Sequence, residues 1–237
     1  MHQLKSAIGS IWNPTTITAL DRLLEKVIRR GYGFSNVYAL RHNIAYNLQH
    51  LEFLDILLQE IALTSVLRKQ NVKSFIIVGS GIVESLLTFL LIRANEYKTT
   101  EWELVRKMPG QRKKCKDSFE KIDSYIYRQL PSPRRKEMTF DAMLKKAEAK
   151  RLLGHNHTVY TDLKRVRQLR NRVHLQTIDH PTDTDWNAFS DKNLSVMART
   201  IHEIFTGSVF SPTTEQKKYF AYLTKYFAEQ WNTLDEG

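Results

Sequence analysis

The stretch FIIVGSGIVESLLTFLLI, residues 75–92, is the most apolar window of this chain. It is long enough for a helix, but it carries Glu84, serines and two glycines. These residues make it too polar and too interrupted for a membrane span. We predict instead that it forms a core helix of a soluble, cytoplasmic protein.

The rest of the sequence also shows helical spacing. Apolar residues recur at intervals of three and four from Leu40 to Ile61, and no continuous period-two pattern typical of strands is found. Glycine (9) and proline (6) are scarce for this length. We therefore predict an all-α chain, with helices at 15–30, 36–70, 72–97, 137–153, 158–176, 184–206 and 213–231. The stretch 36–70 is expected to be one long helix or two joined helices, and Asn71 is expected to separate it from the next helix. A further helix is expected at about 114–129 between loops.

Size, charge and cysteine content bound the class of protein. A chain of 237 residues is enough for one domain with a sizeable core, so a single domain over 1–237 is expected. Its net charge of +11 fits a nucleic acid or another anionic partner without choosing between them. The one cysteine, Cys115, excludes an intrachain disulfide and a cysteine-type zinc site. With no signal-peptide pattern at the N-terminus, these features predict a cytoplasmic location.

The segment RQLRNRVHLQ, residues 167–176, carries the most informative polar pattern. Apolar spacing gives its helix a buried face made of Leu163, Val166, Leu169 and Val173. Beside that face, within a sector of roughly 100°, lie Arg167, Arg170, Asn171 and His174. A cation, an amide and an imidazole side by side can hold a phosphate and move a proton.

The residues Arg170-Asn171-Arg172-Val173-His174 resemble the motif of the HEPN domain, an all-α family of toxin–antitoxin, phage-defence and RNA-processing proteins. In that motif, four to six residues separate an arginine from a histidine. Here three residues lie between Arg170 and His174, and six lie between Arg167 and His174. Residues 75–87 and 140–153 resemble two further helices of the family, in the family's order. The resemblance implies a helical bundle over about 40–205, with extra helices at 15–30 and 213–231. It also implies a homodimer whose motif helices meet in one composite site.

The activity that follows is metal-independent RNA cleavage. The 2′-OH of RNA attacks the adjacent phosphate, and His174 serves as general base or acid. Arg170 and Arg167 stabilise the phosphorane, and Asn171 positions His174 or the phosphate. A dimer supplies the second histidine that a base and an acid together require. The partners expected are RNA and, from the resemblance, an antitoxin or other regulatory protein; no metal or cofactor is needed.

Two groups of cations are expected to bind RNA. The motif helix contributes Lys164, Arg165 and Arg172, and the basic zone at 106–136 contributes Arg112, Lys113 and Lys114. The basic zone at 106–136 is expected equally to be a solvated surface or an RNA-binding surface. Its Tyr125 and Tyr127 are suited to stack on bases, although core packing is the favoured expectation for both rings.

Simpler interpretations stand beside each functional one. The motif helix can be a basic amphipathic helix whose His174 hydrogen-bonds in the core and whose arginines pair with carboxylates such as Glu84. Because Glu84 is in an apolar run, it is expected to meet an arginine or a backbone amide. His155-Asn156-His157 is expected to be a solvated turn before that helix rather than a metal site. A non-catalytic protein of the same family that binds RNA or nucleotide, or holds a partner protein, is the alternative function. A helical interaction protein with incidental charge is the third.

Overall fold

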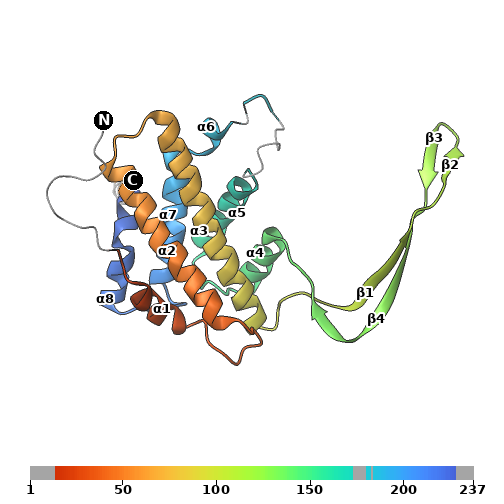
Figure 1. Cartoon of the computed structure of the whole chain (residues 1–237), viewed down its shortest axis with the longest axis horizontal. Helices are drawn as coiled ribbons and strands as arrows, with labels where there is room; N and C mark the ends of the chain where they lie inside the picture. Colours follow the sequence, from red (N-terminus) through yellow and green to blue (C-terminus); the bar gives the residue numbers. More distant parts are fainter. Residues whose placement is uncertain (1–13, 173–179, 183, 228–237) are drawn as a thin grey trace. The chain divides into compact units, whose positions relative to one another are not determined.

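The structure is a computed structural model that describes residues 14–172, 180–182 and 184–227. It divides into two compact units, a helical one formed by Met1–Asn95 with Phe140–Gly237, and a second one formed by Glu96–Thr139. The helical unit consists of α1 (Ile17–Glu25), α2 (Val37–Glu60), α3 (Ser65–Arg93), α4 (Phe140–Ala149), α5 (His157–Asn171), α6 (Asp185–Ala188), α7 (Asp191–Thr206), α8 (Thr214–Lys217) and the 3-10 helix η1 (Lys218–Tyr226) (Figure 1).

Helix α3 is the core helix predicted from residues 75–92. It contacts α2, α4, α5, α6 and α7, and its side chains Phe75 and Phe89 are fully buried. It is also the one helix in the described residues that is long and apolar enough to cross a membrane, but 61% of its apolar window is buried inside the protein. This burial is what a core helix of a soluble protein shows.

The helix boundary after α2 lies earlier than predicted. The chain leaves the helix at Ile61, which is extended, and α3 begins at Ser65, so Asn71 is inside α3 rather than at a break. Val72 and Phe75, next to Asn71, are completely buried. Their packing outweighs the low intrinsic helix propensity of a single asparagine.

Small residues bring α3 close to α7. A Cβ atom at Gly79 would lie 2.9 Å from the side chain of Met197 on α7, which is closer than carbon atoms normally approach. The close packing of α3 against α7 at this point therefore depends on the missing side chain of Gly79. Gly81 differs, because it is exposed and nothing lies near its Cβ position.

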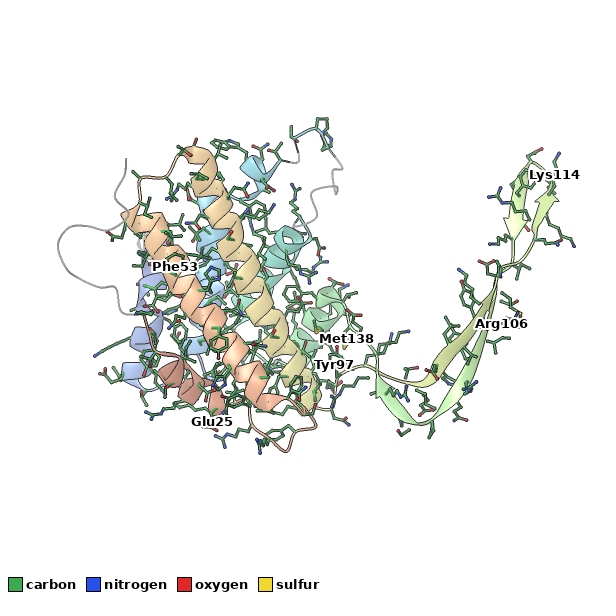
Figure 2. The ribbon with its side chains drawn as sticks, viewed as in Figure 1. Glu25, Phe53, Tyr97, Arg106, Lys114 and Met138 are labelled. Carbon is green, nitrogen blue, oxygen red and sulfur yellow. The ribbon has the colours of Figure 1, made fainter. Side chains whose placement is uncertain are left out.

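The second unit overturns the all-α prediction, because it is formed by antiparallel strands. A long ribbon pairs β1 (Thr99–Met108) with β4 (Ser124–Arg135), and a short hairpin pairs β2 (Arg112–Cys115) with β3 (Ser118–Lys121). Figure 2 labels Arg106 on the long ribbon and Lys114 on the short hairpin. Helices dominate the chain, but its fold class is mixed, and the helix predicted at about 114–129 is wrong.

Local chemistry accounts for the shape of this unit. Lys116 has a left-handed φ of 52° in the two-residue turn between β2 and β3, which a helix would not allow. Pro131 and Pro133 fall where the β1–β4 register shifts, because proline has no N–H to donate to a ladder. The ribbon is closed at its base by the Lys136 N–H, which donates to the carbonyl of Lys98 at 2.9 Å.

Histidine 202, on α7, makes stability depend on pH. Burial, and secondarily the charge of Lys217, lowers the pKa of its imidazole below the ordinary value. Its ring lies 5.3 Å from that of Phe227. Because this pKa is lower in the folded state, the unfolded state binds the proton more tightly. The stability that neutral His202 contributes is therefore complete above about pH 6.5 and is lost as the pH falls through the folded pKa.

We therefore expect His202→Gln to make stability less dependent on pH. Between pH 7.5 and pH 5.5, wild-type protein should lose more free energy of unfolding than the variant, as measured by denaturant titration. The matched control is His155→Gln, which alters an exposed histidine and should leave the wild-type pH dependence in place. Equal losses in wild type and His202→Gln would contradict the prediction.

Candidate RNA site around helix α5

Helix α5 is anchored at its start by Asn156. The Asn156 side chain accepts a hydrogen bond from the Thr158 N–H at 3.1 Å and donates one to Glu203 at 3.3 Å. An asparagine in this position satisfies an amide that the helix leaves unpaired. The segment His155-Asn156-His157 is thus the start of a helix, and its asparagine is a cap.

The buried face of α5 agrees with the prediction as far as the helix is described. Leu163 and Val166 are fully buried and Leu169 nearly so, while Val173 lies outside the described residues. This face packs against α3, α4 and α7. The period of three and four therefore orients α5, and its polar stripe lies beside the core.

The C-terminal end of α5 carries three of the four residues of the polar stripe. The helix ends at Asn171, where the Arg172 N–H bonds to the carbonyls of Arg170 and Leu169. The prediction had extended it to residue 176. Arg167, Arg170 and Asn171 are therefore on the helix as expected, and His174 lies outside the described residues.

Arg170 pairs with Glu84 of α3. One of its Nη atoms lies 3.1 Å from a Glu84 carboxylate oxygen, and the side chains are 41% and 27% exposed. The expectation that Glu84 meets an arginine is thus confirmed. Within the described part of the chain, only one of the five guanidinium N–H donors of Arg170 is used. The others can face a ligand while Glu84 fixes the position of the group.

Arg167 pairs with Asp141 of α4 at 3.3 Å, and Lys145 binds the same carboxylate at 2.7 Å. The hydrogen bond from Lys145, and secondarily the charge of Arg167, lowers the pKa of Asp141 despite partial desolvation. The Nε of Arg167 is buried and has no hydrogen-bond partner among the residues that the structure describes. Glu84 and Asp141 thus hold the two arginines from different helices.

Two other cations of the motif helix also have partners. Lys164 reaches Glu148 at 2.9 Å, and the Nε of Arg165 donates to the amide oxygen of Asn193 at 2.7 Å. The cluster is therefore less repulsive than its sequence indicates, because α3, α4 and α7 supply acceptors. A phosphate that binds here shares these side chains with groups already in place.

The second group of predicted RNA-binding cations belongs to a different kind of element. Arg112, Lys113 and Lys114 are exposed on β2 of the second unit, not in a loop before a helix. Tyr125 and Tyr127 are about half exposed on β4. Core packing, the favoured expectation for these two rings, is therefore wrong.

Sequence reasoning missed the ion pair between Asp162 of α5 and Arg199 of α7. Its two hydrogen bonds measure 2.8 and 2.9 Å, and Asp162 is buried. It also missed Asp141, the partner of Arg167. Each pair joins residues far apart in sequence, and no local spacing points to either.

The weakly buried pair of Arg170 and Glu84 is expected to contribute little to stability. Partly exposed ion pairs are screened by water, so Glu84→Gln should lower the free energy of unfolding by less than about 1 kcal/mol. Denaturant titration at unchanged m-value measures this. A loss of several kcal/mol would show that the pair is a structural support of the core rather than a surface contact.

The chain matches no protein-family model, no curated protein and no solved structure. The chemistry assigned to α5 therefore depends on the residues and contacts given above. The resemblance of residues 170–174 to the HEPN motif remains a hypothesis.

Proposed function

We propose that the protein is a metal-independent endoribonuclease of the HEPN type, which cleaves RNA by attack of the 2′-OH on the adjacent phosphate. One observation carries the proposal: α5 holds Arg167, Arg170 and Asn171 at its C-terminal end, and its last residue, Asn171, is three positions before His174 in the sequence. Two carboxylates fix the arginines, as catalytic positioning requires. The net charge of +11 fits a polyanionic substrate.

Each residue has a separate part in the proposed reaction. His174 removes the proton from the 2′-OH or returns one to the departing 5′-oxygen. The guanidinium groups of Arg170 and Arg167 neutralise the charge that builds on the phosphorane. Asn171 orients His174 or the phosphate through its amide. A homodimer that brings two motif helices together provides both the base and the acid.

The products identify this mechanism. Intramolecular attack leaves a 2′,3′-cyclic phosphate and a 5′-hydroxyl, and DNA, which has no 2′-OH, is not a substrate. In the cell the proposal corresponds to a cytoplasmic toxin or antiphage effector controlled by an antitoxin or other regulatory protein.

The test is incubation of the purified chain with end-labelled RNA, with and without EDTA, followed by analysis of the new ends. A DNA oligonucleotide of the same sequence is the parallel substrate. We expect RNA cleavage that persists in EDTA, gives cyclic-phosphate ends and spares DNA. Loss of cleavage in EDTA, or equal cleavage of DNA, would exclude the mechanism.

The second candidate is an RNA-binding protein of the same type that does not cleave. It is favoured by Arg112, Lys113 and Lys114, which are exposed on β2 and do not belong to the motif helix. Such a protein should bind RNA with a steep salt dependence and leave it intact. Binding without new ends, unchanged in His174→Ala, would favour this candidate over the enzyme.

A further inference from the structure

One face of the β1–β4 ribbon gathers aromatic side chains. Directly paired residues of an antiparallel ribbon lie on the same face, and residues two apart on a strand do so as well. The pairs Trp102 with Gln129, Leu104 with Tyr127 and Lys107 with Tyr125 therefore share a face. The pairs that occupy the other face are Glu103 with Arg128, Arg106 with Ile126 and Met108 with Ser124.

The aromatic face is open to solvent. Trp102 is 52% exposed, Tyr125 47% and Tyr127 53%. In the described part of the chain, nine of the sixteen exposed large apolar side chains belong to the unit Glu96–Thr139. Soluble proteins rarely expose so many apolar groups together unless the surface binds something.

Charge identifies the class of ligand. The segment 96–139 holds twelve Lys and Arg against seven Asp and Glu. Lys107 lies on the aromatic face itself, with its ammonium 5.4 Å from the centre of the Tyr125 ring. Arg106 and Arg128 lie on the other face of the ribbon and make no ion pair among the described residues. A face that combines rings with a cation, in a basic unit, suits a polyanion that also carries flat apolar groups, as a nucleic acid does.

Geometry favours a single strand. Tyr125 and Tyr127 are two residues apart on an unbroken stretch of β4, so their attachment points are about 7 Å apart. This is twice the roughly 3.4 Å rise between bases stacked in one strand, so bases can lie against successive rings. In a duplex the flat faces of the bases are covered by their neighbours, whereas a single strand can splay them out.

We infer that the β1–β4 ribbon is a binding surface for single-stranded nucleic acid. Trp102, Tyr125 and Tyr127 stack on bases, and Lys107, on the same face, contacts a phosphate. This inference goes beyond the proposed cleavage, because it needs neither His174 nor any residue of α5. The recognised chemistry, an extended polyanion with exposed bases, is common to RNA and DNA.

The test measures binding of the full-length chain carrying His174→Ala to a fluorescein-labelled oligouridine of about 12 nucleotides. Anisotropy gives the dissociation constant, and His174→Ala keeps the result separate from cleavage. We expect Tyr127→Ile to weaken binding about tenfold, because it removes the ring and keeps a strand-forming side chain of similar size. Tyr127→Phe keeps the ring and should retain the affinity, which separates loss of stacking from loss of folding.

Matched controls use aromatic residues of equal exposure in the helical unit. Tyr46 on α2 is 53% exposed and Trp186 on α6 is 50% exposed. Tyr46→Ile and Trp186→Leu should leave the affinity unchanged, while Trp102→Leu should lower it as Tyr127→Ile does. Quenching of the Trp102 fluorescence by oligouridine, obtained as the difference between the parent and Trp102→Phe, would report the stacking directly.

Other ligands give different results. Equal affinity for a 12-base-pair duplex and the single strand, with Tyr127→Ile silent, would overturn the inference in favour of phosphate contacts alone. Absence of nucleic-acid binding, with a self-association that Tyr127→Ile abolishes, would assign the face to a second copy of the chain. Oligodeoxythymidine should bind as oligouridine does; a strong preference for RNA would add a 2′-OH contact to the stacking.

Discussion

Replacing His174 by alanine is expected to lower the rate of RNA cleavage by about 10²–10⁴-fold, the contribution of one positioned general acid or base. The substrate 2′-OH is a poor nucleophile until its proton is taken, and at neutral pH a histidine is the residue best suited to take it. Arg170, held by Glu84, cannot replace it, because a guanidinium does not lose its proton in proteins.

The measurement is a single-turnover time course in EDTA with RNA labelled at its 5′ end. The matched control is His155→Ala, which removes an exposed histidine two residues before the first residue of α5. This variant should cleave RNA at the wild-type rate. A parallel time course with Arg170→Lys tests whether the planar guanidinium group is needed, because lysine keeps the charge but cannot donate two parallel hydrogen bonds to a phosphate. We expect this variant to cleave more slowly than wild type. Cleavage by His174→Ala at the wild-type rate would remove His174 from the mechanism.

Replacing Asp162 by alanine is expected to cost about 3 kcal/mol of stability, the lower end for breaking a buried ion pair. Asp162 on α5 is 8% exposed and Arg199 on α7 is 20% exposed, and two hydrogen bonds join them. That hydrogen bonding raises the pKa of Arg199. Without Asp162, the guanidinium remains charged at the interface between two helices and loses its main acceptor.

Denaturant titration would show this loss as a lower midpoint at unchanged m-value. The double variant Asp162→Leu/Arg199→Met should be more stable than Asp162→Ala alone, because it also removes the guanidinium charge that Asp162→Ala leaves without its main acceptor. Glu84→Gln supplies the comparison with a more exposed pair. A loss below about 1 kcal/mol for Asp162→Ala would mean that solvent screens this pair as it does a surface one.

The helical unit was predictable where local spacing decides burial. Leu163, Val166 and Leu169 are buried on α5 because a helix places residues three and four apart on one face. The same reasoning predicted that α3 is a core helix. The apolar residues around Glu84 in the sequence predicted that its carboxylate would have a hydrogen-bonding partner. The choice of Arg170 as that partner depends on the packing of α3 against α5, which no local pattern contains.

The β-ribbon was missed for a physical reason. Strands are recognised in a sequence by the alternation of apolar and polar residues, and this alternation arises when one face is buried. Both faces of the β1–β4 ribbon are exposed, so the pairs Glu103 with Arg128 and Arg106 with Ile126 carry no such signal. What remained visible was Tyr125-Ile126-Tyr127, a run of strand-forming residues within a segment predicted to be a helix.

The hydrogen bond between Lys136 and Lys98 has a consequence for how the length of the ribbon can vary. It closes the chain at the base of the second unit, so the polypeptide leaves and re-enters at neighbouring points. With respect to the helical unit, the segment between Lys98 and Lys136 is a loop whose two ends are held together. Doubling or halving the length of such a loop changes the entropic free energy of closing it by only about 0.6 kcal/mol. Insertions and deletions between Lys98 and Lys136 can thus lengthen or shorten the ribbon itself while α3 and α4 keep their own packing.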